Sequence, residues 1–389
     1  MRAVAGSDSV VAGRLSFGCV VTRLHLVPIL GMLVACQAQG GTPAGATLAV
    51  PSVTLPATAT PVPSATVVRT PPSLPALYQS PLLNPLDTVH TYVQDNCQYL
   101  RKKWSPDKAA PGTVVMVVML RSINQGRAEG QGAMTDTSFA RMLAELHGQR
   151  FEAINMVQLG DFLESNAKIP VRSVALIQDG RRYAENFSKH FRSYWDEWGW
   201  PVISAWDMQG DTTEALWEEQ AALESEGWVD HQVYGPTIKA DGSALSDGFV
   251  TDQLQAPMAA FRQRFQKAPI AVIWPSGLDR RSAQAARALG YRLGFTINPR
   301  GPLMFNWVPL ADSADKFRPS YFPEGPVEDP LMTLPRYWPG QVLPNLDAVR
   351  IMGDEAASLA RQNKATEMAY YDIVCAGTHG PIEEAPSTP

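Results

Sequence analysis

The most constraining feature of the chain is a repeated joint, in which a helical pattern ends at a glycine and an apolar run follows within a few residues. The joint occurs at Gly148, Gly199, Gly227 and Gly290. Glycine at such a position adopts the left-handed conformation that closes a helix. A series of these joints indicates β/α units and therefore parallel strands.

The apolar runs that follow or precede these joints are short and rich in β-branched residues. They read TVVMVVML, FEAINMV, SVALIQ, PVISAWD, WVDHQVY, IAVIWP and YRLGFTIN. The clearest helical patterns between them are TSFARMLAELHG and NFSKHFRSYWDEWG, whose apolar residues recur at the helical period. We predict an α/β fold, a distorted (β/α) barrel of about seven parallel strands. The sequence alone leaves the closure of the ring open.

The first 36 residues are typical of an export signal. Arg14 and Arg23 precede the apolar run LHLVPILGMLVAC, which is too short to span a membrane stably. Its last four residues, Leu-Val-Ala-Cys, resemble the lipobox of bacterial lipoproteins. The resemblance implies that Cys36 is the lipid attachment site and that the rest of the chain lies outside the cytoplasm, anchored to the cell membrane. The alternative is an ordinary signal peptide with a chance cysteine.

Composition divides the remainder into a tether, a domain and a tail. Eight prolines lie between Pro43 and Pro75, and proline interrupts both helices and strand ladders. We therefore predict a disordered Pro/Thr-rich tether at 37–80, the barrel domain at 81–380 and a disordered tail at 381–389. Cys97 and Cys375 lie near the two ends of that domain, where an exported location permits either a disulfide or two buried thiols.

The charge of the chain argues against one class of partner. The net charge is −5 and no run of basic residues stands out, so nothing in the sequence indicates nucleic-acid binding. The oligomeric state is not predictable from these features.

Candidate site residues lie where the predicted strands end, because the loops at the carboxyl ends of barrel strands carry the sites. No H-E-x-x-H or C-x-x-C motif occurs among them. The strand ends read Gln178-Asp179-Gly180, Trp206-Asp207, Asp230-His231, Trp274-Pro275-Ser276-Gly277 and Asn298.

The order of these segments resembles the polysaccharide deacetylases (NodB homology, carbohydrate esterase family 4), nearest the branch acting on poly-N-acetylglucosamine. The resemblance covers roughly 114–338 and includes SVALIQDG, WEEQAALESEGWVDHQVYG, IAVIWPSG, ARALGYRLGFTINPRGP and LMTLPRYW. It implies an N-acetylated polysaccharide as partner and metal-assisted amide hydrolysis, with a divalent ion such as zinc as cofactor.

The residues that would carry this chemistry are only partly present. In the family pattern, the base aligns with Gln178, the metal-binding aspartate with Asp179, and the first metal-binding histidine with His231. The second histidine aligns with Gly235, which offers no ligand. The segment that helps to stabilise the oxyanion aligns with 274–277 and includes Pro275 and Ser276. The resemblance therefore implies a weak or inactive deacetylase.

Three hypotheses follow for function. In the first, the barrel mouth binds a glycan without cutting it, with Asp207 and the aromatic faces of Trp206, Trp274 and Trp307 as substrate contacts. In the second, a rearranged metal site of Asp179, His231 and either Asp230 or Asp207 keeps a working hydrolase. In the third, the domain is a surface scaffold without a sugar ligand.

Overall fold

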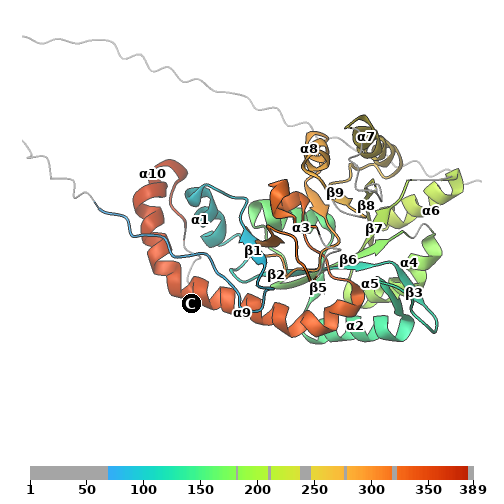
Figure 1. Cartoon of the computed structure of the whole chain (residues 1–389), viewed down its shortest axis with the longest axis horizontal. Helices are drawn as coiled ribbons and strands as arrows, with labels where there is room; N and C mark the ends of the chain where they lie inside the picture. Colours follow the sequence, from blue (N-terminus) through green and yellow to red (C-terminus); the bar gives the residue numbers. More distant parts are fainter. Residues whose placement is uncertain are drawn as a thin grey trace, which may run out of the picture. The chain divides into compact units, whose positions relative to one another are not determined.

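The computed structural model describes residues 69–180, 183–208, 212–236, 247–275, 278–317 and 322–383. Its centre is a seven-stranded sheet in which every pairing is parallel (Figure 1). The strands pair in the order β10-β9-β8-β7-β6-β2, and β5 pairs with the start of β6. Their bounds are β2 (Val114–Leu120), β5 (Glu152–Ala153), β6 (Arg172–Asp179), β7 (Val202–Trp206), β8 (Val229–Tyr234), β9 (Ala271–Ile273) and β10 (Leu293–Phe295).

An extended segment, 334–337, joins the two edges of this sheet. Leu334 forms a parallel bridge with Phe295 of β10, and Tyr337 forms a parallel bridge with Val118 of β2. The backbone N–H of Leu334 donates to Gly294 at 2.8 Å, and that of Tyr337 donates to Val117 at 2.7 Å. The ring whose closure the sequence left open is therefore closed, and the prediction of a distorted (β/α) barrel is confirmed.

The strands are buried on both faces, which explains their continuous apolar runs. In β2, Val115, Val117 and Met119 pack inside the barrel, together with residues of α3 (Met156–Ser165). The alternate residues Met116 and Val118 pack outward against the helices. Side chains of a strand point alternately to the two faces, so odd positions of β2 face inward and even positions face outward.

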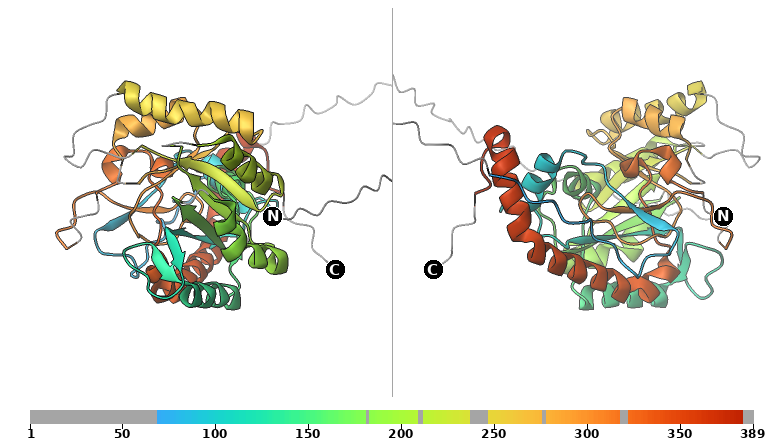
Figure 2. Two further views of the ribbon diagram at one scale, coloured as in Figure 1. Left: turned by 90° about the vertical axis from the view of Figure 1, so that its right-hand side faces the viewer. Right: turned by 60° about the vertical axis from the view of Figure 1, so that its left-hand side comes forward.

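Helices cover the outside of the barrel. Figure 2 shows α7 and α8 on one side of the sheet and α2 and α9 on the opposite side. Among the described residues, no helix combines the length and the apolar character that a membrane span requires. The bounds are α1 (Asn96–Trp104), α2 (Asp136–Gly148), α4 (Ala184–His190), α5 (Arg192–Trp198), α6 (Glu214–Ser225), α7 (Asp247–Arg264), α8 (Arg280–Ala288), α9 (Pro339–Tyr370) and α10 (Ala376–His379).

The predicted helical patterns and glycine joints are confirmed with two corrections. Gly199, Gly227 and Gly290 have positive φ, as expected for residues that close a helix. Gly148 instead belongs to α2, and Arg150 adopts the left-handed conformation there, with φ of 63°. The pattern predicted as one helix is divided at Phe191 into α4 and α5, although its apolar residues pack into the same core cluster.

Several elements have no counterpart in the predicted pattern. They are the antiparallel pair β1 (Asp87–His90) and β11 (Val308–Ala311), the short pair β3 (Ser122–Asn124) and β4 (Ala133–Thr135), the 3-10 turns η1 (Gly325–Val327) and η2 (Pro330–Met332), and the π-helical turn η3 (Tyr371–Cys375). The 32-residue helix α9 also belongs here; it contacts β2 and α2 and leads through η3 toward α1.

The ends of the domain are held together. Cys97 of α1 and Cys375 of η3 form a disulfide, which is the first of the two alternatives that the sequence left open. Some described residues of the predicted tether and tail pack against the domain. Leu74 and Ile382 pack with Cys97 and Cys375, and Tyr78 stacks on Trp307. The compact unit accordingly begins near residue 67.

Candidate functional site

The carboxyl ends of the strands place Asp179 beside Arg121. Leu120 of β2 is the register partner of Gln178 of β6. The next residue of each strand, Arg121 and Asp179, therefore lies at the same height along the sheet and on its inward face. Arg121 Nε lies 3.2 Å from Asp179 Oδ2. The Asp179 side chain is 2% exposed and that of Arg121 is 50% exposed. Arg121 therefore forms the solvent side of this pair.

A second arginine, Arg336, reaches the same place from the closing segment. It is buried, its Nη2 donates to the carbonyl oxygen of Trp274 at 2.9 Å, and its Nη1 contacts Met119 Sδ. The guanidinium carbons of Arg121 and Arg336 lie 5.7 and 5.8 Å from the ring centroid of Trp338. Cation–π attraction of this kind helps to hold two positive groups near one another.

The charges at the mouth act on one another. Burial raises the pKa of Asp179, and the positive charges of Arg336 and Arg121 oppose that rise. Burial lowers the pKa of Arg336 to about 10, against the attraction of Asp179. Burial and the charge of Asp179 raise the pKa of Tyr234, which is half-buried at the end of β8. Asp207 also lies within electrostatic reach, because its charge contributes to raising the pKa of Asp179.

These five side chains, Arg121, Asp179, Asp207, Tyr234 and Arg336, are called the mouth cluster below. Asp179 Oδ1 has no hydrogen-bond partner among the described residues. The cluster thus combines a buried carboxylate, a half-exposed guanidinium and a half-buried phenol. This set suits a ligand that is rich in hydroxyl or amide groups.

The predicted pairing of His231 with Asp179 is wrong. His231 is the register partner of Ser204, which is the partner of Gln178, so these side chains share the outward face. Asp179 lies on the inward face. His231 Nδ1 lies 2.7 Å from Glu224 Oε2, and Nε2 lies 2.7 Å from Gln220 Oε1. Both ring nitrogens are occupied by protein contacts, and burial lowers the pKa of the imidazole.

Asp230 and Gly235 do not complete a metal site either. Asp230 accepts from the backbone N–H of Met156 at 2.7 Å and from Lys267 Nζ at 2.5 Å, near the start of α3. A Cβ at Gly235 would lie 2.7 Å from Val272 Cγ1 and 2.9 Å from a ring carbon of Trp274. The position aligned with the second histidine therefore cannot take a side chain without displacing its neighbours.

Gln178, at the position aligned with the base, faces the helices and is held by backbone atoms. Its Nε2 donates to the carbonyl oxygens of Leu120, Arg121 and Asp179 at 3.0–3.1 Å. The amide thus fixes the turn that carries the mouth cluster.

The predicted aromatic contacts are not at the mouth. Trp206 packs against Trp217 in the outward core, and Trp274 Nε1 donates to Met332. Trp307 lies at the other end of the barrel, where its Nε1 donates to Tyr78. Of the remaining predicted residues, Pro275 follows Trp274 and is half-buried, whereas Ser276 and Cys36 lie outside the described residues.

The side chains present do not fit a divalent ion at the mouth. Within the described ranges, the groups of three or more His, Cys, Asp or Glu residues with converging ligand atoms reduce to Asp95, Cys97 and His379. Cys97 is in a disulfide and offers no thiolate. Two guanidinium groups lie near Asp179. Each positive charge at about 5 Å would repel a divalent ion there by on the order of 6 kcal/mol, at an effective dielectric constant of about 20.

Three residues of the mouth cluster, Arg121, Tyr234 and Arg336, were not assigned a role from the sequence. The available signal was positional, because Arg121 follows a buried strand and Tyr234 ends the run WVDHQVY. Arg336 lies in LPRY, a segment without strand character that nevertheless closes the barrel.

Comparison with known proteins gives similarity of fold. No family model matches the sequence, and no curated protein matches it. Among solved structures, the chain is similar to the deacetylase PplD of Streptococcus pyogenes in complex with acetate, with 14% identity over 62% of this chain and 99% of that chain and a TM-score of 0.47. It is also similar to the deacetylase domain of BpsB from Bordetella bronchiseptica, with 16% identity over 59% of this chain and 96% of that chain and a TM-score of 0.41. A third similar structure is the polysaccharide deacetylase BC0361 of Bacillus cereus, with 13% identity over 61% of this chain and 69% of that chain and a TM-score of 0.43.

Proposed function

We propose that the domain binds an N-acetylated polysaccharide of the cell envelope at the mouth cluster and does not hydrolyse it by the metal-assisted route. The observation that carries the proposal is the salt bridge between Asp179 and Arg121, with Arg336 buried behind it. These guanidinium groups take the place where a cation would otherwise contact Asp179. A glycan is supported by the order of segments in the sequence and by the polar, hydroxyl-matching character of the cluster.

Binding would use the side chains in distinct ways. The half-exposed guanidinium of Arg121 donates to sugar hydroxyl or carbonyl oxygens, and the buried carboxylate of Asp179 holds that guanidinium in place. Arg336, which is buried, holds the carboxylate in position and does not reach the ligand. We further propose that the chain is an exported lipoprotein, so that the anchor at Cys36 and the tether keep this mouth near the envelope.

Two assays of the full exported chain test this proposal. Chitin oligomers are first tested for binding by calorimetry, comparing the wild type with Arg121→Ala and with the distant exposed variant Arg350→Ala as a matched control. We expect roughly tenfold weaker binding at the mouth in Arg121→Ala and wild-type binding in Arg350→Ala. Acetate release from the same oligomers is then measured with and without a chelator.

The outcomes separate the three hypotheses. Binding without acetate release supports the proposal. Chelator-sensitive release at an ordinary enzyme rate contradicts it in favour of a metal-dependent hydrolase. Release that survives the chelator but is lost in Asp179→Asn contradicts it in favour of metal-free hydrolysis. Absence of binding at millimolar oligomer contradicts the proposal in favour of a surface scaffold without a sugar ligand.

A further inference from the structure

A second cavity lies at the opposite end of the barrel from the mouth cluster. Its volume is about 440 Å³, within the range of roughly 300–1,000 Å³ of small-molecule sites. Gly112 and Thr113, which directly precede β2, line it, whereas Arg121 follows the end of β2. At about 3.3 Å per residue, the two sites are roughly 25 Å apart along that strand.

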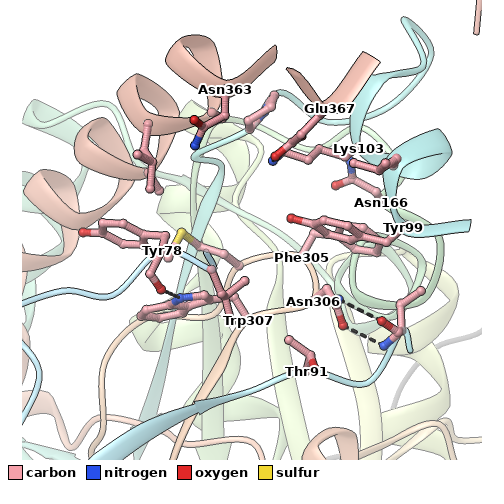
Figure 3. Close-up of a pocket in the computed structure, with 18 of the residues that line it drawn as sticks. Tyr78, Thr91, Tyr99, Lys103, Asn166, Phe305, Asn306, Trp307, Asn363 and Glu367 are labelled. Atoms are coloured by element: carbon pink, nitrogen blue, oxygen red, sulfur yellow. Dashed lines mark hydrogen bonds and ion pairs between the residues drawn. The ribbon is translucent and has the colours of Figure 1, made fainter. Parts of the chain in front are cut away.

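Two stacked aromatic pairs form opposite walls of this cavity, as Figure 3 shows. Tyr78 stacks on Trp307 with ring centroids 5.9 Å apart. Tyr99 stacks on Phe305 with centroids 6.0 Å apart and an interplanar angle of 12°. All four residues line the cavity. Walls of this kind offer apolar faces to a flat or ring-shaped ligand.

Polar groups without partners are also present in the lining. Neither the Tyr99 hydroxyl nor the Asn363 carboxamide has a hydrogen-bond partner within the part of the chain that the structure describes, and both residues are half-buried. The Tyr99 hydroxyl points toward the space between the two aromatic pairs (Figure 3). A hydroxyl and a carboxamide without protein partners can form hydrogen bonds with a ligand.

The charges of the lining cancel. Lys103 Nζ lies 2.8 Å from Glu367 Oε1, and Glu367 Oε2 accepts from Trp104 Nε1 at 2.6 Å. The side chains of Lys103 and Glu367 are the charged members of the described lining. A charged ligand would therefore be desolvated without a counter-ion, which is costly. The cavity suits a neutral molecule.

The walls are fixed to one another. Tyr99 and Lys103 come from α1, and Asn363 and Glu367 come from α9. The ion pair of Lys103 with Glu367 joins these helices directly, and the disulfide ties α1 to η3, which continues α9. A cavity whose walls are held in this way loses little conformational entropy on binding.

From these observations we infer that the cavity binds a neutral sugar unit of a polysaccharide, at a site separate from the mouth cluster. A pyranose ring combines apolar C–H faces, which stack between aromatic side chains, with hydroxyl groups that pair with Tyr99 and Asn363. The inference goes beyond the proposed function, because it needs none of the residues of the mouth cluster.

The test is calorimetry of the full exported chain with N,N′-diacetylchitobiose, comparing Asn363→Leu, Tyr99→Phe and Arg121→Ala. Asn363→Leu and Tyr99→Phe preserve shape and remove hydrogen-bonding groups, and near-UV circular dichroism verifies that each variant is folded. We expect each of these two variants to weaken the cavity site by about three- to tenfold, and Arg121→Ala to leave it unchanged.

A readout in the cavity supports the assignment. Sugar binding there changes the fluorescence of the buried Trp307, and this change persists in Arg121→Ala. The inference is overturned if diacetylchitobiose gives no signal that depends on Asn363 or Tyr99. Loss of all binding in Arg121→Ala also overturns it while leaving the mouth proposal intact. Conversely, binding that is lost only in the cavity variants supports the inference and contradicts the mouth proposal.

Discussion

Asp179 and His231 lie on opposite faces of the same parallel sheet. His231 shares its register row with Ser204 and Gln178, which point toward the helices, whereas Asp179 points into the barrel beside Arg121. A hydrolytic metal centre needs ligands that converge on one side of the strands. The register of the strands therefore keeps His231 out of any metal site at Asp179, and Asp179 has arginine partners instead.

The charges of Asp179 and Arg336 are predicted to be energetically coupled. Removing either partner leaves a buried charge less well compensated, so Asp179→Asn and Arg336→Met should each lower the free energy of unfolding by about 3 kcal/mol. The double variant should lose less free energy of unfolding than the two single variants lose together, with a difference of about 1–3 kcal/mol. Denaturant unfolding measures this cycle.

A surface ion pair gives the matched control for that cycle. Arg350 and Asp354 form an exposed pair four residues apart on α9, for which coupling of about 0.5 kcal/mol or less is expected. Equal coupling in the two cycles would contradict the account of the mouth cluster.

Stability is predicted to fall as the pH is lowered from 7 to 5, because of His231. Burial lowers the pKa of His231 in the folded state, while the unfolded chain binds the proton near the ordinary value of about 6.5. Below that value the unfolded state gains protons that the folded state does not, so stability is lost. Thermal unfolding of His231→Gln should show a smaller loss over this window.

The control for this pH dependence is His147→Gln, which removes an exposed histidine that stacks on Trp198. The comparison shows whether the slope of stability against pH depends on the buried histidine in particular. If His231→Gln and the wild type have the same slope, another group causes the loss.

A side chain at position 235 is predicted to destabilise the domain. Gly235→Ala would place a Cβ within 3 Å of Val272 and Trp274, both of which are buried, and overpacking of this kind costs about 1–3 kcal/mol. Gly340→Ala is the control, because a Cβ at that helical glycine meets no atom within 4 Å. The urea concentration at the unfolding midpoint of Gly340→Ala should equal that of the wild type or rise slightly, whereas the midpoint of Gly235→Ala should fall.

Loss of the disulfide is predicted to lower stability substantially. The bond between Cys97 and Cys375 closes a loop of 278 residues in sequence separation, and native bridges contribute on the order of 2–5 kcal/mol. Cys97→Ser with Cys375→Ser should therefore unfold at lower denaturant and should bind diacetylchitobiose more weakly in the cavity. Unchanged sugar binding in the reduced but folded protein would show that the bond does not hold the cavity walls.

The sequence predicted the barrel because buried parallel strands leave continuous apolar runs, which differ clearly from helical patterns. It could not predict which side chains of β8 face inward. Asp230, His231 and Gln232 are all polar, so the alternation that normally marks the two faces is absent. The closing segment at 334–337 contains Pro335 and has no strand pattern, and for that reason Arg336 was not identified as part of the site.

The central claim is that arginine side chains, and not a metal, accompany Asp179 at the barrel mouth. Calorimetric titration of the purified full chain with Zn²⁺ tests it most directly, with Asp179→Ala measured beside the wild type. The account predicts the same weak, unsaturated heats for both proteins up to millimolar Zn²⁺. Saturable binding of one Zn²⁺ at micromolar concentration or below, lost in Asp179→Ala, would contradict it.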